Sequence, residues 1–227
     1  MRDWTKIHAV IFDVDGTLYD QRKLRLLMGK DLLLHAVWQQ RGLRELMIIR
    51  AFRQERTRHR HDVVEDLNAE QYRWAARRCG VSEQLVRSVV TEWIYSRPLR
   101  YLAACKRRGL DQCLSLFESR RTLTAVFSDY PATEKIAALG LPISTCAAAT
   151  DGTINRLKPD PRGLHVVCEA LETPARSCLY IGNDEELDAA CAHRAGMQSL
   201  ILGSGTNHQL EYFRSFTELA TELRQAS

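Results

Sequence analysis

The sequence predicts an α/β protein built on a mainly parallel sheet of about five strands, with one all-helical insert. Two observations support this prediction. Apolar runs of strand length alternate with segments of helical periodicity from residue 109 onward, and one further run precedes them at residues 7–12. Between these parts, residues 20–104 show only helical periodicity. We therefore expect residues 1–19 and 105–227 to form the sheet domain and residues 20–104 a helical cap.

The first strand is predicted from Ile7 to Phe12, an unbroken apolar run with the length of a strand buried on both faces. Gly16 supplies the break after it. Asp13 and Asp15 then lie at the carboxyl edge of the sheet, where open α/β sheets bind ligands. Alternate side chains of a strand point to the same side, so the two carboxylates should lie close together and repel. A hard divalent cation would offset that repulsion.

The insert is predicted to be helical throughout. Helices are expected over residues 21–56, 69–79 and 82–95. Gly29 and Gly42 are expected to interrupt the first of them. Gly80 ends the second, and Ser82 is a suitable N-cap for the third.

Strands and helices alternate again in the last part of the chain. Strands are predicted over residues 123–127, 143–148, 178–181 and 199–202. Helices are predicted over residues 109–119, 132–139, 161–171, 185–195 and 210–223. Repeated strand–helix units of this kind form a parallel sheet that is covered on both faces.

Composition points to a globular protein without a membrane span. Hydrophobic residues make up 45% and charged residues 26% of the chain, and charges interrupt every apolar run before the ~20 residues that a span needs. Acidic residues occupy the region where a signal peptide would be apolar. Seven cysteines without a CxxC spacing argue against a disulfide framework or a zinc site. We expect a cytoplasmic protein with reduced thiols.

Positive charge is concentrated in the first part of the insert. Residues 21–60 hold eleven Lys and Arg and three acidic residues, a net charge of +8, whereas the whole chain has +4. Two interpretations remain open. These side chains either cover solvated helix faces or include some that attract an anionic ligand.

Polar residues also follow other predicted strands. Ser128 and Asp129 come directly after one strand and before a helix, so Ser128 either binds a phosphate oxygen or caps that helix. Lys158 lies in a loop, where Pro159 disfavours helical backbone. These places and the Asp13 segment should meet at one edge of a parallel sheet.

Together these segments resemble the active-site motifs of the haloacid dehalogenase-like (HAD-like) hydrolase superfamily. The sequence DVDGTL, which begins at Asp13, is similar to the nucleophile motif, and the segments around Ser128 and Lys158 are similar to the second and third motifs. The sequence GNDEELD resembles the acidic fourth motif, with Asn183 where Asp is usual. The resemblance covers about residues 1–19 and 105–220, essentially the whole predicted sheet domain, and implies a Rossmann-like core with a C1-type helical cap.

The resemblance implies a role for each residue. Asp13 would be the nucleophile, Asp15 the general acid and base, and Lys158 the group that stabilises charge. Phosphate would be bound by Ser128, Asp129, Gly16 and Thr17. Magnesium would be held by residues among Asp13, Asp15, Asn183, Asp184 and Asp188. Either Asn183 or Asp184 would be the direct ligand, with Asp188 acting through a water or orienting Lys158.

The function that this resemblance implies is Mg²⁺-dependent hydrolysis of a small phosphate monoester through an aspartyl-phosphate. A phosphomutase of the β-phosphoglucomutase type is the alternative with the same motifs. A third hypothesis is a binding protein whose basic helical segment docks on nucleic acid or an anionic membrane surface. We expect a small phosphorylated substrate as the partner and no DNA or RNA; the oligomeric state stays open.

Overall fold

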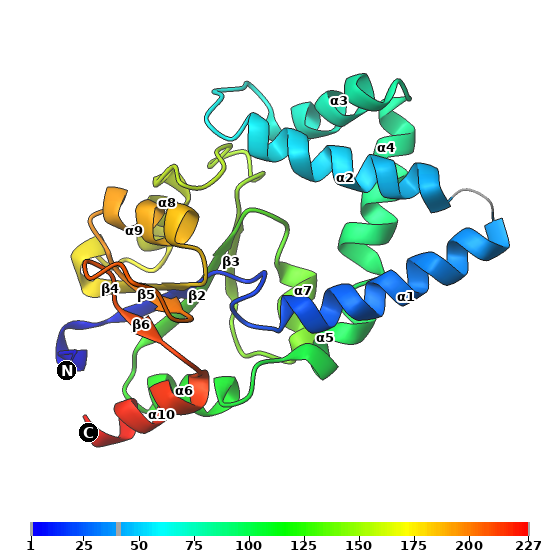
Figure 1. Ribbon diagram of the computed structural model, residues 1–227. Coiled ribbons are helices and arrows are strands. Elements are labelled where there is room, and N and C mark those ends of the chain that lie inside the picture. The colour runs from blue at the N-terminus through cyan, green and yellow to red at the C-terminus, as the bar shows by residue number, and fades with distance from the viewer. Residues whose placement is uncertain (1, 40–41, 227) are drawn as a thin grey trace.

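The computed structural model describes residues 2–39 and 42–226, without the side chains of residues 36–39. Residues 40 and 41, which belong to the predicted helix at 21–56, lie outside the described residues. The chain forms a sheet covered by helices, from which further helices extend to one side (Figure 1). No helix in the described part of the chain has the length and apolar character needed to cross a membrane.

The described residues form one sheet of six parallel strands in the order β3-β2-β1-β4-β5-β6. The strands are β1 (Ala9–Phe12), β2 (Leu123–Ser128), β3 (Thr145–Ala148), β4 (Cys178–Gly182), β5 (Gln198–Leu202) and β6 (Tyr212–Phe213). In the central strand, Phe12 is in register with Val126 and Ile181, so three carboxyl ends meet at one edge. The predicted α/β class with a parallel sheet is confirmed.

Helices cover both faces of this sheet. Val10 and Phe12 of β1 pack with α6 (Leu110–Ser119) and α10 (Phe216–Gln225). Ala9 and Ile11 point to the other face, where α8 (Arg162–Ala170) and α9 (Ala190–Arg194) lie. All four side chains of β1 are completely buried, which explains why this strand is apolar without alternation.

The helical insert after β1 is confirmed and has an apolar core of its own. Its elements are α1 (Gln21–Gln39), α2 (Gly42–Arg58), α3 (Leu67–Cys79), α4 (Glu83–Val90), a π-helical turn (Thr91–Ser96) and α5 (Leu99–Cys105). Phe52, Tyr72 and Trp93 are buried together in this core.

The sheet part has further short elements. They are helical segments at Trp4–Lys6 and Ala175–Ser177, α7 (Thr133–Leu139), and a π-helical turn at Glu185–Ala189 that continues into α9.

Helix ends inside the insert follow the predicted signals. The Ser82 hydroxyl accepts a hydrogen bond from Leu85 N at 3.3 Å, and Gly80 ends α3 with φ of +61°. Gly42 begins α2 as predicted, but the predicted interruption at Gly29 is wrong. Gly29 lies inside α1, where the flanking good helix formers outweigh the modest cost of one glycine.

The C-terminal prediction was also wrong in part. Tyr212 and Phe213, placed in a helix by their apolar spacing, form the short edge strand β6. The helix begins only after Ser215, whose hydroxyl accepts a hydrogen bond from Glu218 N at 3.2 Å. This Ser-x-x-Glu cap fixes the helix start, and a two-residue strand is too short to produce a periodic pattern.

Candidate active site

Asp13 lies directly after β1, and its backbone N–H donates to Ile181 O at 2.8 Å. The carboxylate is buried and held on both sides. Its Oδ1 accepts from Lys158 Nζ at 2.6 Å, and its Oδ2 accepts from Thr17 Oγ1 at 3.0 Å. Burial raises the pKa of Asp13 to about 7, and the Asp188 charge adds to this rise, while Lys158 opposes it.

Lys158 is the cation at the centre of the site. Its ammonium also donates to Asp188 Oδ1 at 2.8 Å, and the side chain is almost fully buried. Burial opposes the charged form, but Asp13 and Asp188 raise the pKa of Lys158 well above its ordinary value. The family resemblance implies that Lys158 stabilises charge at the site, and the structure places its ammonium against the Asp13 carboxylate.

Asp188 organises the loop after β4. Its Oδ2 accepts from the backbone N–H groups of Asn183 at 2.9 Å and Asp184 at 3.0 Å. Gly182 allows this close approach, because a Cβ there would lie 2.4 Å from the Asp188 side chain. The Asp184 carboxylate points elsewhere and accepts from Leu187 N at 3.0 Å, as the N-cap of the following helical turn.

Asn183 is the residue of this loop that lies beside Asp13. Its Oδ1 is 2.8 Å from Thr17 Oγ1, the hydroxyl that also contacts Asp13 Oδ2. A carboxylate oxygen and an amide oxygen therefore lie on either side of one small hydroxyl. Oxygen donors of this kind fit Mg²⁺, which usually takes one or two carboxylates and keeps several waters. The described residues contain no cluster of three or more His, Cys, Asp or Glu arranged for a metal ion.

Asp15 is held by two residues that the sequence analysis did not single out. Lys135 Nζ from α7 donates to both carboxylate oxygens, at 2.6 and 2.8 Å, and the Tyr19 hydroxyl donates to Oδ1. Burial alone would raise the pKa of Asp15, but Lys135 and the Tyr19 hydrogen bond bring it below its ordinary value. The pKa values of Asp13 and Asp15 therefore shift in opposite directions. Burial dominates at Asp13, whereas Lys135 and Tyr19 outweigh burial at Asp15.

The four residues predicted to bind phosphate do not share one environment. Ser128 ends β2 and is buried, with its hydroxyl accepting from Tyr130 N at 3.3 Å. The Asp129 carboxylate instead accepts from Lys158 N at 3.0 Å. In the described chain, the N–H groups of Asp15 and Gly16 have no hydrogen-bond acceptor, which leaves two donors for an anion beside Asp13.

Arg56 connects the helical insert to this edge of the sheet. Its guanidinium is buried, donates to Asp129 O at 2.6 Å and to Gln71 Oε1, and lies 4.4 Å from the centre of the Tyr130 ring. The sequence offered no means of choosing Arg56 among its basic neighbours, because they are all Arg or Lys at helical spacing. Lys135 and Tyr19 likewise belong to no sequence motif that would have marked them as partners of Asp15.

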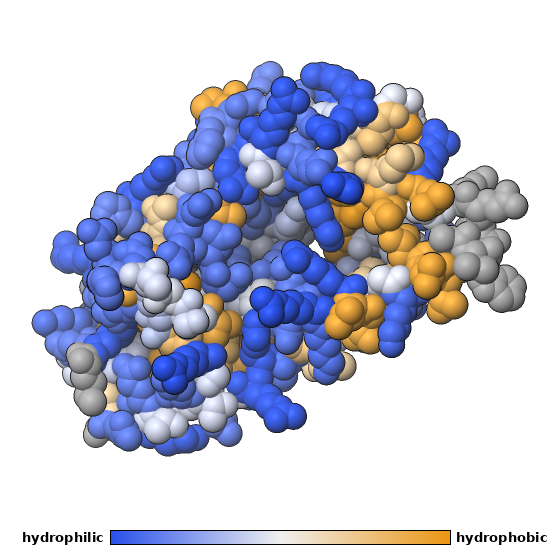
Figure 2. All heavy atoms as spheres, viewed as in Figure 1, coloured by the Kyte–Doolittle hydropathy of each residue, from blue (hydrophilic) through white to orange (hydrophobic). Residues whose placement is uncertain are grey.

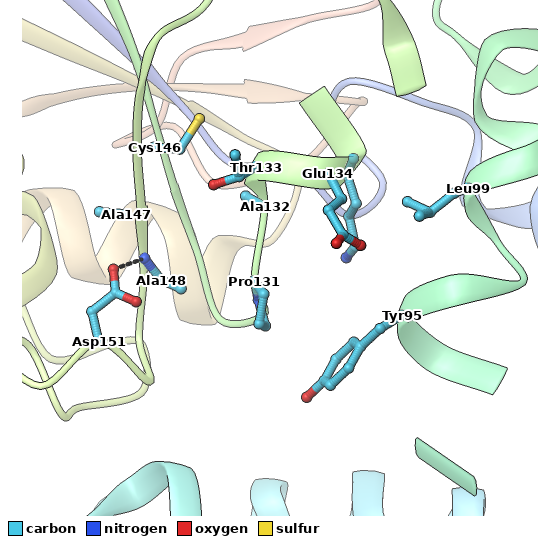
Figure 3. Close-up of a pocket in the computed structure, with 11 residues that line it drawn as sticks. Tyr95, Leu99, Pro131, Ala132, Thr133, Glu134, Cys146, Ala147, Ala148 and Asp151 are labelled. Atoms are coloured by element: carbon cyan, nitrogen blue, oxygen red, sulfur yellow. Dashed lines mark hydrogen bonds between the residues drawn. The ribbon is translucent and has the colours of Figure 1, made fainter. Parts of the chain in front are cut away.

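Two cavities lie between the insert and the sheet. A cavity of about 450 Å³, here called the Asp15 cavity, is lined by Asp15, Lys135 and Tyr130 and by side chains of α1 and α2. A second, of about 300 Å³, lies on the other side of Lys135. Figure 3 shows Tyr95 from the insert and Pro131 from the sheet side at its walls. Only the first is lined by a carboxylate of the β1 tip, so it is the candidate substrate cavity.

Comparison with known proteins decides the family. A family model described as haloacid dehalogenase-like hydrolase matches residues 7–196, which is most of the chain. The chain is a HAD-like hydrolase. A comparison with curated proteins found no match to the sequence of this hydrolase.

Solved structures share the fold of this hydrolase over nearly the whole chain. A 2-haloacid dehalogenase from Pseudomonas syringae pv. Tomato DC3000 is 17% identical with a TM-score of 0.68, over 97% of this chain and 100% of that one. A β-phosphoglucomutase from Clostridium difficile is 17% identical with a TM-score of 0.63, over 96% of both chains. A HAD phosphatase from Thermococcus onnurineus is 17% identical with a TM-score of 0.63, over 96% of this chain and 98% of that one. At 17% identity these similarities establish the fold alone. The chemistry has to be inferred from the residues of the site.

Proposed function

We propose that this HAD-like hydrolase is a Mg²⁺-dependent phosphatase that hydrolyses a small phosphate monoester through an aspartyl-phosphate. The observation that carries the proposal is the pair of differently held carboxylates, Asp13 with Lys158 and Asp15 with Lys135. Breaking a phosphate ester requires a nucleophile and a second group that gives a proton to the leaving alkoxide. A haloacid dehalogenase expels a halide, which needs no proton, so Asp15 favours the phosphatase.

Asp13 Oδ2 and Asn183 Oδ1 are the side-chain oxygens that would hold the metal, and Thr17 keeps them together. A bound Mg²⁺ would supply positive charge to the phosphate oxygens. Asp184, as an N-cap, is the weaker of the two candidate ligands that the sequence left open. We assign Asp188 to the orientation of Lys158 and not to direct ligation, because each of its oxygens already accepts two hydrogen bonds, whereas each oxygen of Asp13 accepts one.

In the proposed reaction, a carboxylate oxygen of Asp13 attacks phosphorus as the bond to the leaving oxygen breaks. Asp15 has no proton of its own in the free protein, because Lys135 and Tyr19 lower its pKa, so it takes one from the monoprotonated ester and gives it to the leaving oxygen. It later removes a proton from the water that attacks the aspartyl-phosphate and passes it to the released phosphate. Lys158 and the free N–H groups of Asp15 and Gly16 stabilise charge on the transferring oxygens. The Asp15 cavity admits the alcohol part of the ester.

The test is hydrolysis of a panel of phosphate monoesters with Mg²⁺ and with excess chelator, beside Asp13→Asn. We expect turnover with Mg²⁺, loss without it, and a decrease of about 10³-fold or more in kcat for Asp13→Asn. Turnover of a 2-haloalkanoate but of no phosphate ester would overturn the proposal. Turnover that needs a sugar bisphosphate as activator would instead assign the chain to the phosphomutases.

A further inference from the structure

The Asp15 cavity has two ends of opposite character. At the end next to the sheet are Asp15, Lys135 and the guanidinium-bearing residues Arg25 and Arg53. The walls away from the sheet are apolar and come from α1, α2 and the turn after α4. They include Met28, Leu32, Leu46, Ile49 and Trp93. A phosphate ester bound with its phosphorus near Asp13 would therefore place its alcohol part against the apolar walls.

The charged end suits a phosphate dianion. Neither Arg25 nor Arg53 has an ion-pair or hydrogen-bond partner for its guanidinium among the described residues. Other arginines of the insert are paired with carboxylates, as Arg78 is with Glu55 at 2.6 Å and Arg87 with Glu83 at 2.6 Å. Arg22, Arg44, Arg50 and Arg58 also have no such partner among the described residues, but only Arg25 and Arg53 line this cavity, where they can attract an anion.

The apolar walls offer few hydrogen-bonding groups to a polar alcohol. The Trp93 indole N–H already donates to Glu45 Oε2 at 3.1 Å, so its ring adds apolar surface and no free donor. Sugar hydroxyls placed there would lose hydrogen bonds to water without replacement. An alkyl chain or an aromatic ring would bind there with a favourable free energy, because its apolar surface leaves water.

The apolar surface continues outward from the cavity. Leu46 lines it and is 46% exposed, while Leu43 and Met47, its neighbours on α2, are 76% and 62% exposed. Figure 2 shows hydrophobic residues gathered over the ends of α1 and α2 that lie away from the sheet. Apolar surface therefore extends from the cavity wall at Leu46 to the exposed side of α2.

We propose that the substrate is a phosphate monoester of an apolar alcohol, with an alkyl chain or an aromatic ring, and not a sugar phosphate. This inference rests on the proposed phosphatase function and adds the substrate class. A volume of about 450 Å³ is within the range of small-molecule sites, which are mostly apolar with a few polar groups that fix orientation.

The experiment measures kcat/KM with Mg²⁺ for ethyl, butyl, hexyl and octyl phosphate below their micelle concentrations, with glucose 6-phosphate as the polar comparison. Each methylene that leaves water should raise kcat/KM by about 3–4-fold, so octyl phosphate should exceed ethyl phosphate by about tenfold or more even with partial burial. A flat series, or glucose 6-phosphate preferred over octyl phosphate, would overturn the inference.

Two variants test the wall itself. Leu46→Gln and Met28→Gln should lower the octyl-to-ethyl ratio by about threefold or more, since a polar amide replaces apolar contact. Leu123→Gln is the matched control, because Leu123 is 46% exposed, as Leu46 is, but lies at the amino end of β2 beside Ala9 and outside the cavity. Its ratio should stay at the wild-type value. An unchanged ratio in both wall variants would contradict the inference.

Binding separates this inference from the proposed function. If the wild type hydrolyses no phosphate ester, the proposed function fails. Calorimetry of Asp13→Asn with octyl and ethyl phosphate still measures whether the cavity prefers the longer alkyl chain. Tighter binding of octyl phosphate, reduced by Leu46→Gln in the same background, supports the apolar site. Equal binding of the two esters overturns it.

Discussion

At the scale of single residues, the charge of Asp15 depends on Lys135. The two form an ion pair with distances of 2.6 and 2.8 Å, and the Lys135 side chain is 7% exposed. Removing the ammonium leaves a mostly buried carboxylate without its cation. We expect Lys135→Met to lower the free energy of unfolding at pH 7 by about 1–3 kcal/mol. Urea unfolding measures this loss.

The loss should depend on pH in a defined direction. The pKa of Asp15 is lower in the folded protein than its ordinary 3.8, so the pair stabilises the fold fully above about pH 4. The contribution disappears as pH falls through the folded pKa, and wild type and Lys135→Met should then converge. Lys30→Met, at an exposed position of α1, should stay within about 0.5 kcal/mol of wild type. A difference that persists unchanged at pH 3 would contradict the role of the pair.

Asp13 gives a second residue-level prediction. Burial raises its pKa to about 7 in the metal-free protein, and a carboxyl must lose its proton to bind a cation. The apparent Mg²⁺ affinity should therefore rise about tenfold per pH unit below pH 7 and level off above it. Calorimetry at pH 6, 7 and 8 measures this slope. In Asp13→Asn the slope should vanish, and a slope that survives would assign the proton to another group.

At the scale of elements, the close approach of β4 to the following helical turn positions Asp188. A Cβ on Gly182 would lie 2.4 Å from Asp188 Cβ, Cγ and Oδ2, so Gly182→Ala must displace the carboxylate that holds Lys158. We expect a loss of about 1–3 kcal/mol in unfolding free energy together with a fall in kcat.

Gly152→Ala is the control for that substitution. A Cβ at Gly152 meets no atom within 4 Å, and the glycine does not have a positive φ. Stability and kcat should both stay near wild type. If Gly182→Ala behaves like this control, the contact between β4 and Asp188 is not what positions Lys158.

At the scale of the whole molecule, Asn155 joins the sheet part to the start of α3. Its side chain donates to Val64 O at 2.8 Å and Glu65 O at 3.0 Å, and accepts from Leu67 N at 2.6 Å. Its φ is +50°, a conformation that glycine adopts without strain. Asn155→Gly therefore removes the side-chain bonds while keeping the backbone, and we expect a loss of about 1–3 kcal/mol with faster amide exchange at Leu67.

Glu172→Gly supplies the matched comparison, because Glu172 also has φ of +50° and is exposed. It tests the backbone change alone and should leave amide exchange at Leu67 unchanged. Equal exchange at Leu67 in both variants would show that the Asn155 bonds do not hold the two parts together.

Much of the fold and part of the site could be predicted because the signals are local. The buried run before Asp13 is apolar at every position, since both faces of β1 are covered, and Ser82 and Gly80 act within one helical turn. The motif that starts at Asp13 identified the two carboxylates, and the segment at Lys158 identified the cation of Asp13 but not that of Asp15. The edge strand β6 could not be predicted, because its two residues are too few to show a periodic pattern.

The sequence by itself determined the α/β class, the helical insert, and the strand ends that carry polar residues, because periodicity and turn chemistry depend on near neighbours. Only the tertiary structure decided that Lys135 pairs with Asp15, that Asn183 and not Asp184 lies beside Asp13, and that Arg56 reaches Asp129. Each of these contacts joins residues far apart in the chain or depends on side-chain direction. Such contacts arise when elements pack, and no local pattern encodes them.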